Sequence, residues 1–263
     1  MATGTVNSTS LTLGGVPVLM YHDICAEAAN PERYAVPLPL FHRHLEVLRE
    51  LHTAVIDLPA LRQFSSLPRA VLTFDDGLHG NFSRALPELV SRGMTATFFV
   101  TTSLIGTAGY LTWDQLREMS AAGMTIGSHG HRHIAYTALT AQYAANELTR
   151  SRLMLEDALG SACEAFSAPF GFLNGSTFAA ARAAGFAHIC SSRPWPAAAG
   201  DKDIPRLVVY RYTNAAEFAA LVTGSPWPIL VRRTRDALLH LPKQWMLRAR
   251  PQRLGLEANE AGR

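Results

Sequence analysis

The sequence predicts an α/β protein in which parallel strands alternate with helices that cover them. Four helical stretches are each closed by a glycine, and each is followed by a short run of strand-forming residues; these glycines are Gly93, Gly123, Gly160 and Gly185. Glycine is frequent just past a helix end, and strands that follow helices in this way indicate a parallel sheet. The pattern allows an α/β barrel or an open doubly wound sheet, and both folds place functional residues at the carboxyl ends of the strands.

The elements follow in order from the N-terminus. A buried strand is expected over 16–22, a loop over 27–39, a helix over 41–51, and strands over 54–56 and 70–74. Further helices are expected over 81–92, 112–122, 140–159 and 177–184, and further strands over 95–100, 124–127, 163–167 and 187–192. Thr112 and Gln115 are spaced as a capping box, which marks the start of the second of these helices.

Composition indicates an ordinary globular protein, with 48% apolar and 17% charged residues. The positive charge is confined to the tail: residues 229–263 hold eight Lys/Arg and three Asp/Glu, against 16 and 18 in the rest. Because the body has no basic groove, we exclude nucleic acid as a partner. The three cysteines are widely spaced, so they form neither a metal motif nor a disulfide framework, and Cys163 and Cys190 are expected to be buried thiols.

The first sixteen residues show no signal-peptide pattern, and no apolar run is long enough to span a bilayer. The expected location is therefore the cytoplasm. Residues 227–250 mix apolar and basic side chains, which is typical of a helix that packs on the barrel with a solvated face. The alternative is peripheral contact of this segment with an anionic membrane surface.

Two adjacent carboxylates, Asp75 and Asp76, end the strand expected over 70–74. Strand side chains alternate between faces, so both reach one site only if the chain turns there, which Gly77 permits. Two like charges this close are unfavourable unless a cation or proton lies between them. A carboxylate on a metal ion beside a second carboxylate that acts as a base meets this requirement; the alternative is an ordinary Asp-Gly turn.

Three histidines, His129, His131 and His133, follow the strand expected over 124–127. His129 and His133 are four residues apart, so a helical turn would direct both imidazoles to one side and His131 elsewhere. Two imidazoles, one carboxylate and an open position suit a catalytic Zn²⁺. A solvated histidine cluster on a loop is the alternative.

Such a site suits hydrolysis of an amide. The ion would lower the pKa of a water, and the second carboxylate would take the water's proton. An oxyanion donor and an acid for the leaving amine are also needed. The candidate donor is the backbone N–H beside Pro169-Phe170, and the candidate acid is His22, whose strand ends on the same face of the barrel.

These motifs resemble those of the polysaccharide deacetylases, carbohydrate esterase family 4, over residues 16–212. Residues 73–77 are similar to the first motif, in which the first aspartate is the base and the second a metal ligand. The resemblance therefore implies that Asp75 is the base and Asp76 a ligand. His129 and His133 match the second motif, His-(Ser/Thr)-x-x-His, with Gly130 in place of the hydroxyl residue.

The chain departs from the family pattern in two places. Phe166-Ser167-Ala168-Pro169-Phe170-Gly171 resembles the third motif, Arg-x-Pro-(Tyr/Phe), but Ser167 stands where an arginine normally orients the base. The late Leu-x-x-His motif is absent from the C-terminal part, and residues 19–22 fit it instead. This order resembles the circularly permuted branch, which includes deacetylases of poly-N-acetylglucosamine exopolysaccharides. Trp195 resembles the aromatic wall of the fourth motif. Trp113, at a helix start, is expected to pack against the core, with sugar stacking as the alternative.

The resemblance implies a distorted (β/α) barrel, Zn²⁺ with Co²⁺ or Ni²⁺ as alternatives, and removal of acetyl groups from an N-acetylated glycan, with Pro169, Trp195 and Trp113 near the substrate. It divides the chain into a flexible start (1–15), a catalytic domain (16–225) and a basic amphipathic tail (226–263). Two other functions stay open. One is hydrolysis of a non-sugar amide C–N bond, and the other, favoured by the missing arginine, is non-catalytic glycan binding.

Overall fold

A curled parallel sheet forms the centre of the protein. The computed structural model describes residues 13–26, 32–63, 65 and 67–231. Along the sheet the strands follow the order β10 (Leu207–Val208), β1 (Val18–Tyr21), β5 (Arg69–Phe74), β6 (Thr97–Val100), β7 (Thr125–Ser128), β8 (Ala165–Ser167) and β9 (His188–Cys190). β4 (Ala54–Ile56) pairs with the start of β5, and β2 (Asp23–Cys25) and β3 (Ala35–Pro37) form a separate two-stranded sheet. All these pairings are parallel, so the strands of the main sheet end on one face.

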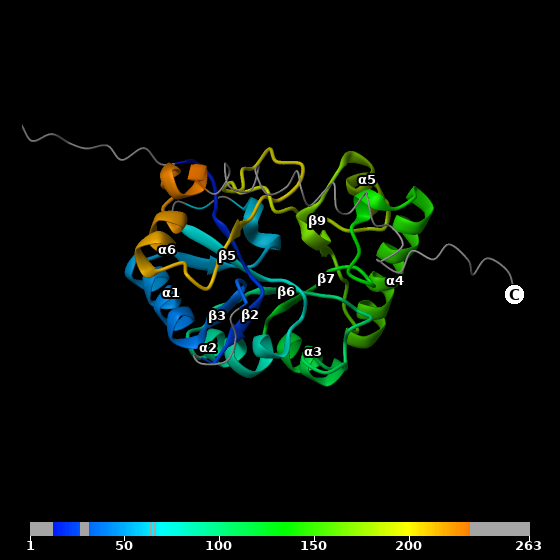
Figure 1. The fold of residues 1–263 in the computed structure, drawn as a ribbon, viewed down its shortest axis with the longest axis horizontal. Helices are drawn as coiled ribbons and strands as arrows, with labels where there is room; N and C mark the ends of the chain where they lie inside the picture. Colours follow the sequence, from blue (N-terminus) through cyan, green and yellow to red (C-terminus); the bar gives the residue numbers. More distant parts are fainter. Residues whose placement is uncertain (1–12, 27–31, 64, 66, 232–263) are drawn as a thin grey trace, which may run out of the picture.

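The helices succeed one another round the outside of this sheet (Figure 1). They are α1 (Leu38–Glu50), α2 (Leu86–Ser91), α3 (Trp113–Ala121), α4 (Ala141–Leu159), α5 (Gly175–Ala183) and α6 (Ala215–Val222). α1 buries Phe41, Leu45 and Leu48, the residues whose helical spacing predicted it. The core lies between these apolar helix faces and the strands, whose side chains are almost all buried.

One segment closes the sheet into a distorted barrel. Cys190 of β9 forms a parallel bridge with Ile204, and a few residues later Leu207 and Val208 pair with β1. The hydrogen-bonded path therefore passes from β9 back to β1 through residues 204–208. This closure confirms the predicted barrel over the open doubly wound sheet, and it directs the carboxyl ends of β1, β5, β7 and β8 toward one cavity.

The predicted elements are present with shifted ends. The capping box of Thr112 and Gln115 starts α3, and Gly160 ends α4 in the left-handed conformation, as predicted. α1 begins earlier than predicted, at Leu38, because a proline is compatible with the first helical turn. The expected helix over 81–92 starts as one π-helical turn, Asn81–Ala85, before α2, and the expected loop over 27–39 includes β3.

Most of the predicted tail lies outside the described residues, as do residues 1–12 of the predicted flexible start. Within the described part, Leu13 donates a backbone hydrogen bond to Gly224, and residues 226–231 are helical, with Ile229 fully buried in the core. None of the described helices combines the length and the apolar character that a bilayer span requires. All three cysteines are buried free thiols.

Candidate active site

The residues that end the strands line a cavity of about 260 Å³ on the carboxyl face of the barrel. β1 ends before His22, β5 before Asp75 and Asp76, and β7 before His129, and all four side chains reach the cavity wall. The strand-end positions identified in the sequence therefore meet at one place, as parallel strands in a barrel require.

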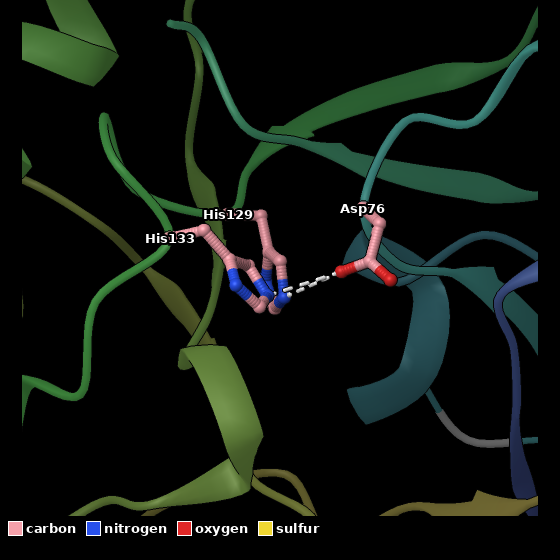
Figure 2. Close-up of side chains that lie close together, drawn as sticks. All are labelled: Asp76, His129 and His133. Carbon is pink, nitrogen blue, oxygen red and sulfur yellow. Dashed lines mark ion pairs between the residues drawn. The ribbon is translucent and has the colours of Figure 1, made fainter. Parts of the chain in front are cut away.

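Asp76, His129 and His133 converge on a common point (Figure 2). Oδ1 of Asp76 lies 3.4 Å from Nε2 of His129 and 3.2 Å from Nε2 of His133. Ligands that surround a tetrahedral Zn²⁺ at about 2.0–2.1 Å are separated by about 3.3 Å. Both separations from Asp76 match this value, all three donor atoms lie within 4.8 Å of one another, and the set of one oxygen and two nitrogens fits such an ion chemically.

The backbone reaches this geometry through turns rather than through a helix. Residues 129–135 contain no helical turn, so the two imidazoles converge by another route than the helical turn considered from their spacing. Gly130 and His133 both have positive φ, at 83° and 52°, as does Asp76 at 74°. A positive φ in a non-glycine residue is unfavourable, so the surrounding contacts must hold these residues in place.

Two buried contacts hold the histidine loop. Nδ1 of His129 lies 2.8 Å from the carbonyl oxygen of Ser167, which leaves Nε2 as the atom that faces Asp76. The buried carboxylate of Glu147 accepts hydrogen bonds from both the backbone N–H and the side-chain Nε–H of Arg132. His131 points away and lies 2.9 Å from the Thr102 hydroxyl, as predicted.

The cluster shifts the pKa of its members. Burial alone would raise the pKa of Asp76, but hydrogen bonds from His129 and His133 outweigh it and hold that pKa well below its usual range. Burial would lower the pKa of His129, and the neighbouring charges of Asp75 and Asp76 raise it instead. Asp76 is therefore ionised at neutral pH, the state that binds a metal ion.

Asp75 is held by an arginine that we did not predict as a site residue. The guanidinium of Arg206 is fully buried and bonds both carboxylate oxygens of Asp75, at 2.7 and 2.8 Å. Its remaining N–H groups donate to the hydroxyls of Thr73 and Ser167 and to the carbonyl of Ser191. All five donors of the side chain are thus satisfied, which fixes its position.

Arg206 lies in the segment that closes the barrel, directly before β10. Its guanidinium also contacts Ser167, the residue at the arginine position of the third motif, so an arginine from elsewhere in the chain orients the aspartate. Burial would raise the pKa of Asp75, and the Arg206 charge outweighs it and lowers that pKa. One signal was available in the sequence: Arg206 is the single charged residue between Ile204 and Tyr210, and an arginine in such a run needs a buried acid.

His22 lies across the cavity from the histidine cluster. Its ring packs against Tyr34 with 4.5 Å between centroids, and its Nδ1 has no hydrogen-bond partner among the described residues. Burial lowers the pKa of His22, and the charges of Asp76 and Asp75 oppose that effect. Phe170 lines the same cavity at a positive φ of 61°, and its ring meets His133 edge-on at 4.7 Å.

The three residues predicted to lie near the substrate are placed differently. Pro169 is buried and begins the short 3-10 turn that presents Phe170. Trp113 and Trp195 are partly buried and pack against the main core, and neither lines the cavity. The aromatic side chains that do line it include Tyr34 and Tyr210, which we did not predict.

Fold and site together define a class of protein, an α/β barrel with one aspartate in an Asp-His-His cluster and a second aspartate beside it at the strand ends. Residues 65–189 match the family model for polysaccharide deacetylase. Over these residues, just under half of the chain, the protein is similar to the polysaccharide deacetylase family.

Individual relatives agree with this assignment. The chain is 32% identical over 177 residues to the putative polysaccharide deacetylase YxkH of Bacillus subtilis. That match covers 65% of this chain and 62% of YxkH, so the chain spans less than two thirds of that relative's length. The deacetylase PplD of Streptococcus pyogenes, solved in complex with acetate, superposes with a TM-score of 0.72 at 25% identity, over 81% of this chain and 99% of PplD. IcaB from Ammonifex degensii shares the fold, with a TM-score of 0.71 at 23% identity, over 80% of this chain and 98% of IcaB.

Proposed function

We propose that the protein is a metal-dependent hydrolase that removes N-acetyl groups from a glycan containing N-acetylhexosamine. One observation carries the proposal: two adjacent aspartates occupy separate surroundings, Asp76 among two imidazoles and Asp75 against a buried arginine. The similarity of residues 65–189 to the polysaccharide deacetylase family model supports deacetylation as the reaction. The metal, with Zn²⁺ as the first candidate and Co²⁺ or Ni²⁺ as alternatives, and the substrate are part of the proposal.

The chain's own residues divide the work between them. Asp76, His129 and His133 would hold the ion, which supplies a Lewis acid for the acetyl carbonyl and lowers the pKa of a water. Asp75 accepts the proton of the attacking water. Because Arg206 keeps Asp75 ionised and bonds both its oxygens, the base stays charged and correctly oriented at neutral pH.

The other two steps need a donor to the oxyanion and an acid. The backbone N–H of Phe170, in the turn at the cavity wall, donates to the oxygen on which negative charge develops. His22 gives a proton to the departing amine. Burial lowers the pKa of His22, so its protonated form is a stronger acid toward the amine than an exposed imidazolium is.

The arrangement around Asp75 removes the reason for the non-catalytic alternative. It depended on an arginine missing from the third motif, and Arg206 takes the corresponding position beside Asp75. Hydrolysis of a non-sugar amide would use the same residues. The experiment below therefore distinguishes a glycan substrate from a non-sugar amide.

The test couples metal analysis to acetate release from the full chain. We expect the purified protein to contain about one equivalent of a divalent metal and to release acetate from N-acetylglucosamine oligomers. Asp75→Asn should lower turnover by about 10²- to 10⁴-fold while the metal is retained. Asp76→Asn is the matched variant, one residue along the chain, and it should lose the metal as well as the activity.

Three outcomes would contradict the proposal. Loss of metal from Asp75→Asn with retention in Asp76→Asn would mean that the two roles are exchanged. Acetate release only from an N-acetylated amine without a sugar would replace the glycan with a simpler amide. Binding of the oligomers without any acetate release at saturating Zn²⁺, Co²⁺ and Ni²⁺ would favour a glycan-binding protein.

A further inference from the structure

One wall of the cavity carries a positive charge that the reaction above does not use. Arg33 lines the cavity together with Tyr34 and Tyr210. Its guanidinium carbon lies 4.4 Å from the ring centre of Tyr210 and 5.4 Å from that of Tyr34. The backbone carbonyl of Arg33 accepts a hydrogen bond from Arg211, so the segment that bears it is anchored to the chain beyond β10.

Arg206 and Arg33 differ in their partners. Arg206 is fully buried and has a carboxylate partner in Asp75, whereas Arg33, on the cavity wall, lies against the rings of Tyr210 and Tyr34. The Nε of Arg33 is buried and has no hydrogen-bond acceptor in the part of the chain that the structure describes. A guanidinium stacked on an aromatic ring keeps its donors in its own plane, where they match a carboxylate or phosphate.

The position of Arg33 determines which part of a substrate would meet it. His22, the acid for the departing amine, packs on Tyr34, and Arg33 lies against the same ring. The acetyl group would lie toward Asp76 and the histidines, so the sugar would lie on the side of Tyr34 and Tyr210. An anionic group carried by the sugar would then be within reach of Arg33.

The charge balance of the cavity favours the same conclusion. Among the described residues, the cavity lining carries the carboxylates of Asp75 and Asp76 and the guanidinium of Arg33, and the buried Arg206 behind Asp75 supplies a second positive charge. A divalent ion on Asp76, His129 and His133 would therefore leave the site with a net positive charge, which attracts an anionic substrate.

We infer that Arg33 binds an anionic substituent of the substrate, a carboxylate or a phosphate on or beside the N-acetylated sugar. This inference rests on the proposed deacetylase function and specifies its substrate class. The aromatic rings of Tyr34 and Tyr210 form the apolar part of the same subsite.

The experiment compares matched substrates on the full-length, metal-loaded protein. The neutral substrate is N,N′-diacetylchitobiose; the carboxylate substrate pairs N-acetylglucosamine with N-acetylmuramic acid; the third is diacetylchitobiose phosphorylated on a primary hydroxyl. We expect kcat/KM to be higher for an anionic substrate than for the neutral one, and the two anionic arms identify which anion is bound. Arg33→Gln should lower that preference by about tenfold to a hundredfold, mainly through KM, and Arg33→Lys should restore part of it.

Arg117→Gln is the matched control, because Arg117 is an exposed arginine on α3 that does not line the cavity. Its preference should equal that of the unaltered chain, and circular dichroism and metal content should agree across the variants. If Arg33→Gln lowers kcat/KM equally for neutral and anionic substrates, Arg33 has only a structural role and the inference is wrong. Acetate release from the neutral substrate without any anionic preference contradicts the inference alone, whereas no release from any substrate overturns the proposed function as well.

Discussion

Asp75 and Asp76 are neighbours in the chain, yet the regions around them differ in construction. Asp76 faces the cavity with its side chain 28% exposed, and its partners are two imidazoles from a single loop. Asp75 is buried, and its partner is a guanidinium from the segment that closes the barrel, 131 residues further along the chain. On the metal side a carboxylate therefore faces two imidazoles at the cavity, whereas the base side is a closed ion pair in which every guanidinium donor is satisfied.

This difference shows how one residue type obtains two roles. In both cases burial raises the pKa of the carboxyl group and the neighbouring groups lower it. The partner then decides what the carboxylate can do. Imidazoles can share a metal ion with Asp76, whereas a guanidinium never gives up its proton, so Asp75 stays a free anion that can accept one from water.

The largest expected effect comes from breaking the base side alone. Arg206→Met leaves Asp75 buried without a counter-charge, and we expect the free energy of unfolding to fall by about 3–5 kcal/mol in chemical denaturation at pH 7 without metal. Asp75→Asn combined with Arg206→Met should recover most of that loss, because a buried pair replaced as a unit can be nearly neutral. Arg193→Met is the control: its ion pair with Asp203 is half-exposed, so its effect should be within about 1 kcal/mol.

The pH dependence of this variant has a definite sign. The pKa of Asp75 is lowered in the folded protein, so the pair contributes stability above the pKa of an unfolded aspartate, about 3.9, and loses it as the pH falls through the folded value. In Arg206→Met the pKa of Asp75 should rise, which moves the acid limb of the kcat/KM profile to higher pH. An unchanged acid limb would mean that Arg206 does not control the ionisation of the base.

A histidine far from the site shows the effect of burial on a pKa, because no carboxylate among the described residues lies beside it. His44 on α1 stacks on Phe218 and lies between the Tyr21 hydroxyl and the Thr213 carbonyl. Burial lowers its pKa to about 4, whereas nearby aspartates raise the pKa of His129. The unfolded state then binds more protons between about pH 6.5 and 4, so stability should fall by about 3 kcal/mol as the pH decreases across that range.

His44→Gln tests this assignment because it removes the titrating group. The slope of unfolding free energy against pH, measured by urea denaturation between pH 7 and 4, should be smaller in the variant than in the unaltered chain. Equal slopes would show that His44 is not the group responsible.

The smallest expected effect comes from a substitution that weakens the metal side without changing any of the three residues expected to bind the ion. Glu147→Gln removes the carboxylate that accepts both the backbone and side-chain N–H groups of Arg132, next to His133. We expect the affinity for Zn²⁺ to fall by about tenfold in competition with a chelator, because the loop would hold its positive-φ conformation less firmly. Glu156→Gln is a close match on the same helix, since Glu156 also accepts from one arginine Nε–H and one backbone N–H. It supports β8 rather than the histidine loop, so its Zn²⁺ affinity should not change; a loss equal to that of Glu147→Gln would indicate general destabilisation of α4.

Local sequence patterns were sufficient to predict the fold class and the residues of the metal cluster. Helical spacing, the capping box at Thr112 and the glycine stops are properties of neighbouring residues, and they predicted α1, α3 and α4 to within a few residues. The prediction of the Asp-His-His cluster depended on two further facts. Asp76 and His129 each follow a strand end, and parallel strands end on one face. The spacing of the histidines did not indicate how the loop brings them together: Gly130 and His133 have positive φ values, which a helical turn would not have.

Only the tertiary structure decided what lies opposite Asp75 and what forms the wall of the cavity. Arg206 reaches Asp75 because residues 204–208 join β9 to β1, a long-range pairing that no local spacing encodes. Tertiary packing likewise decided that Tyr34 and Tyr210 line the cavity while Trp113 and Trp195 pack against the core. The sequence by itself determined which residues can bind a metal ion, because ligand chemistry is a property of each side chain. Barrel closure determined which charged group faces each aspartate, because that depends on how the distant ends of the sheet meet.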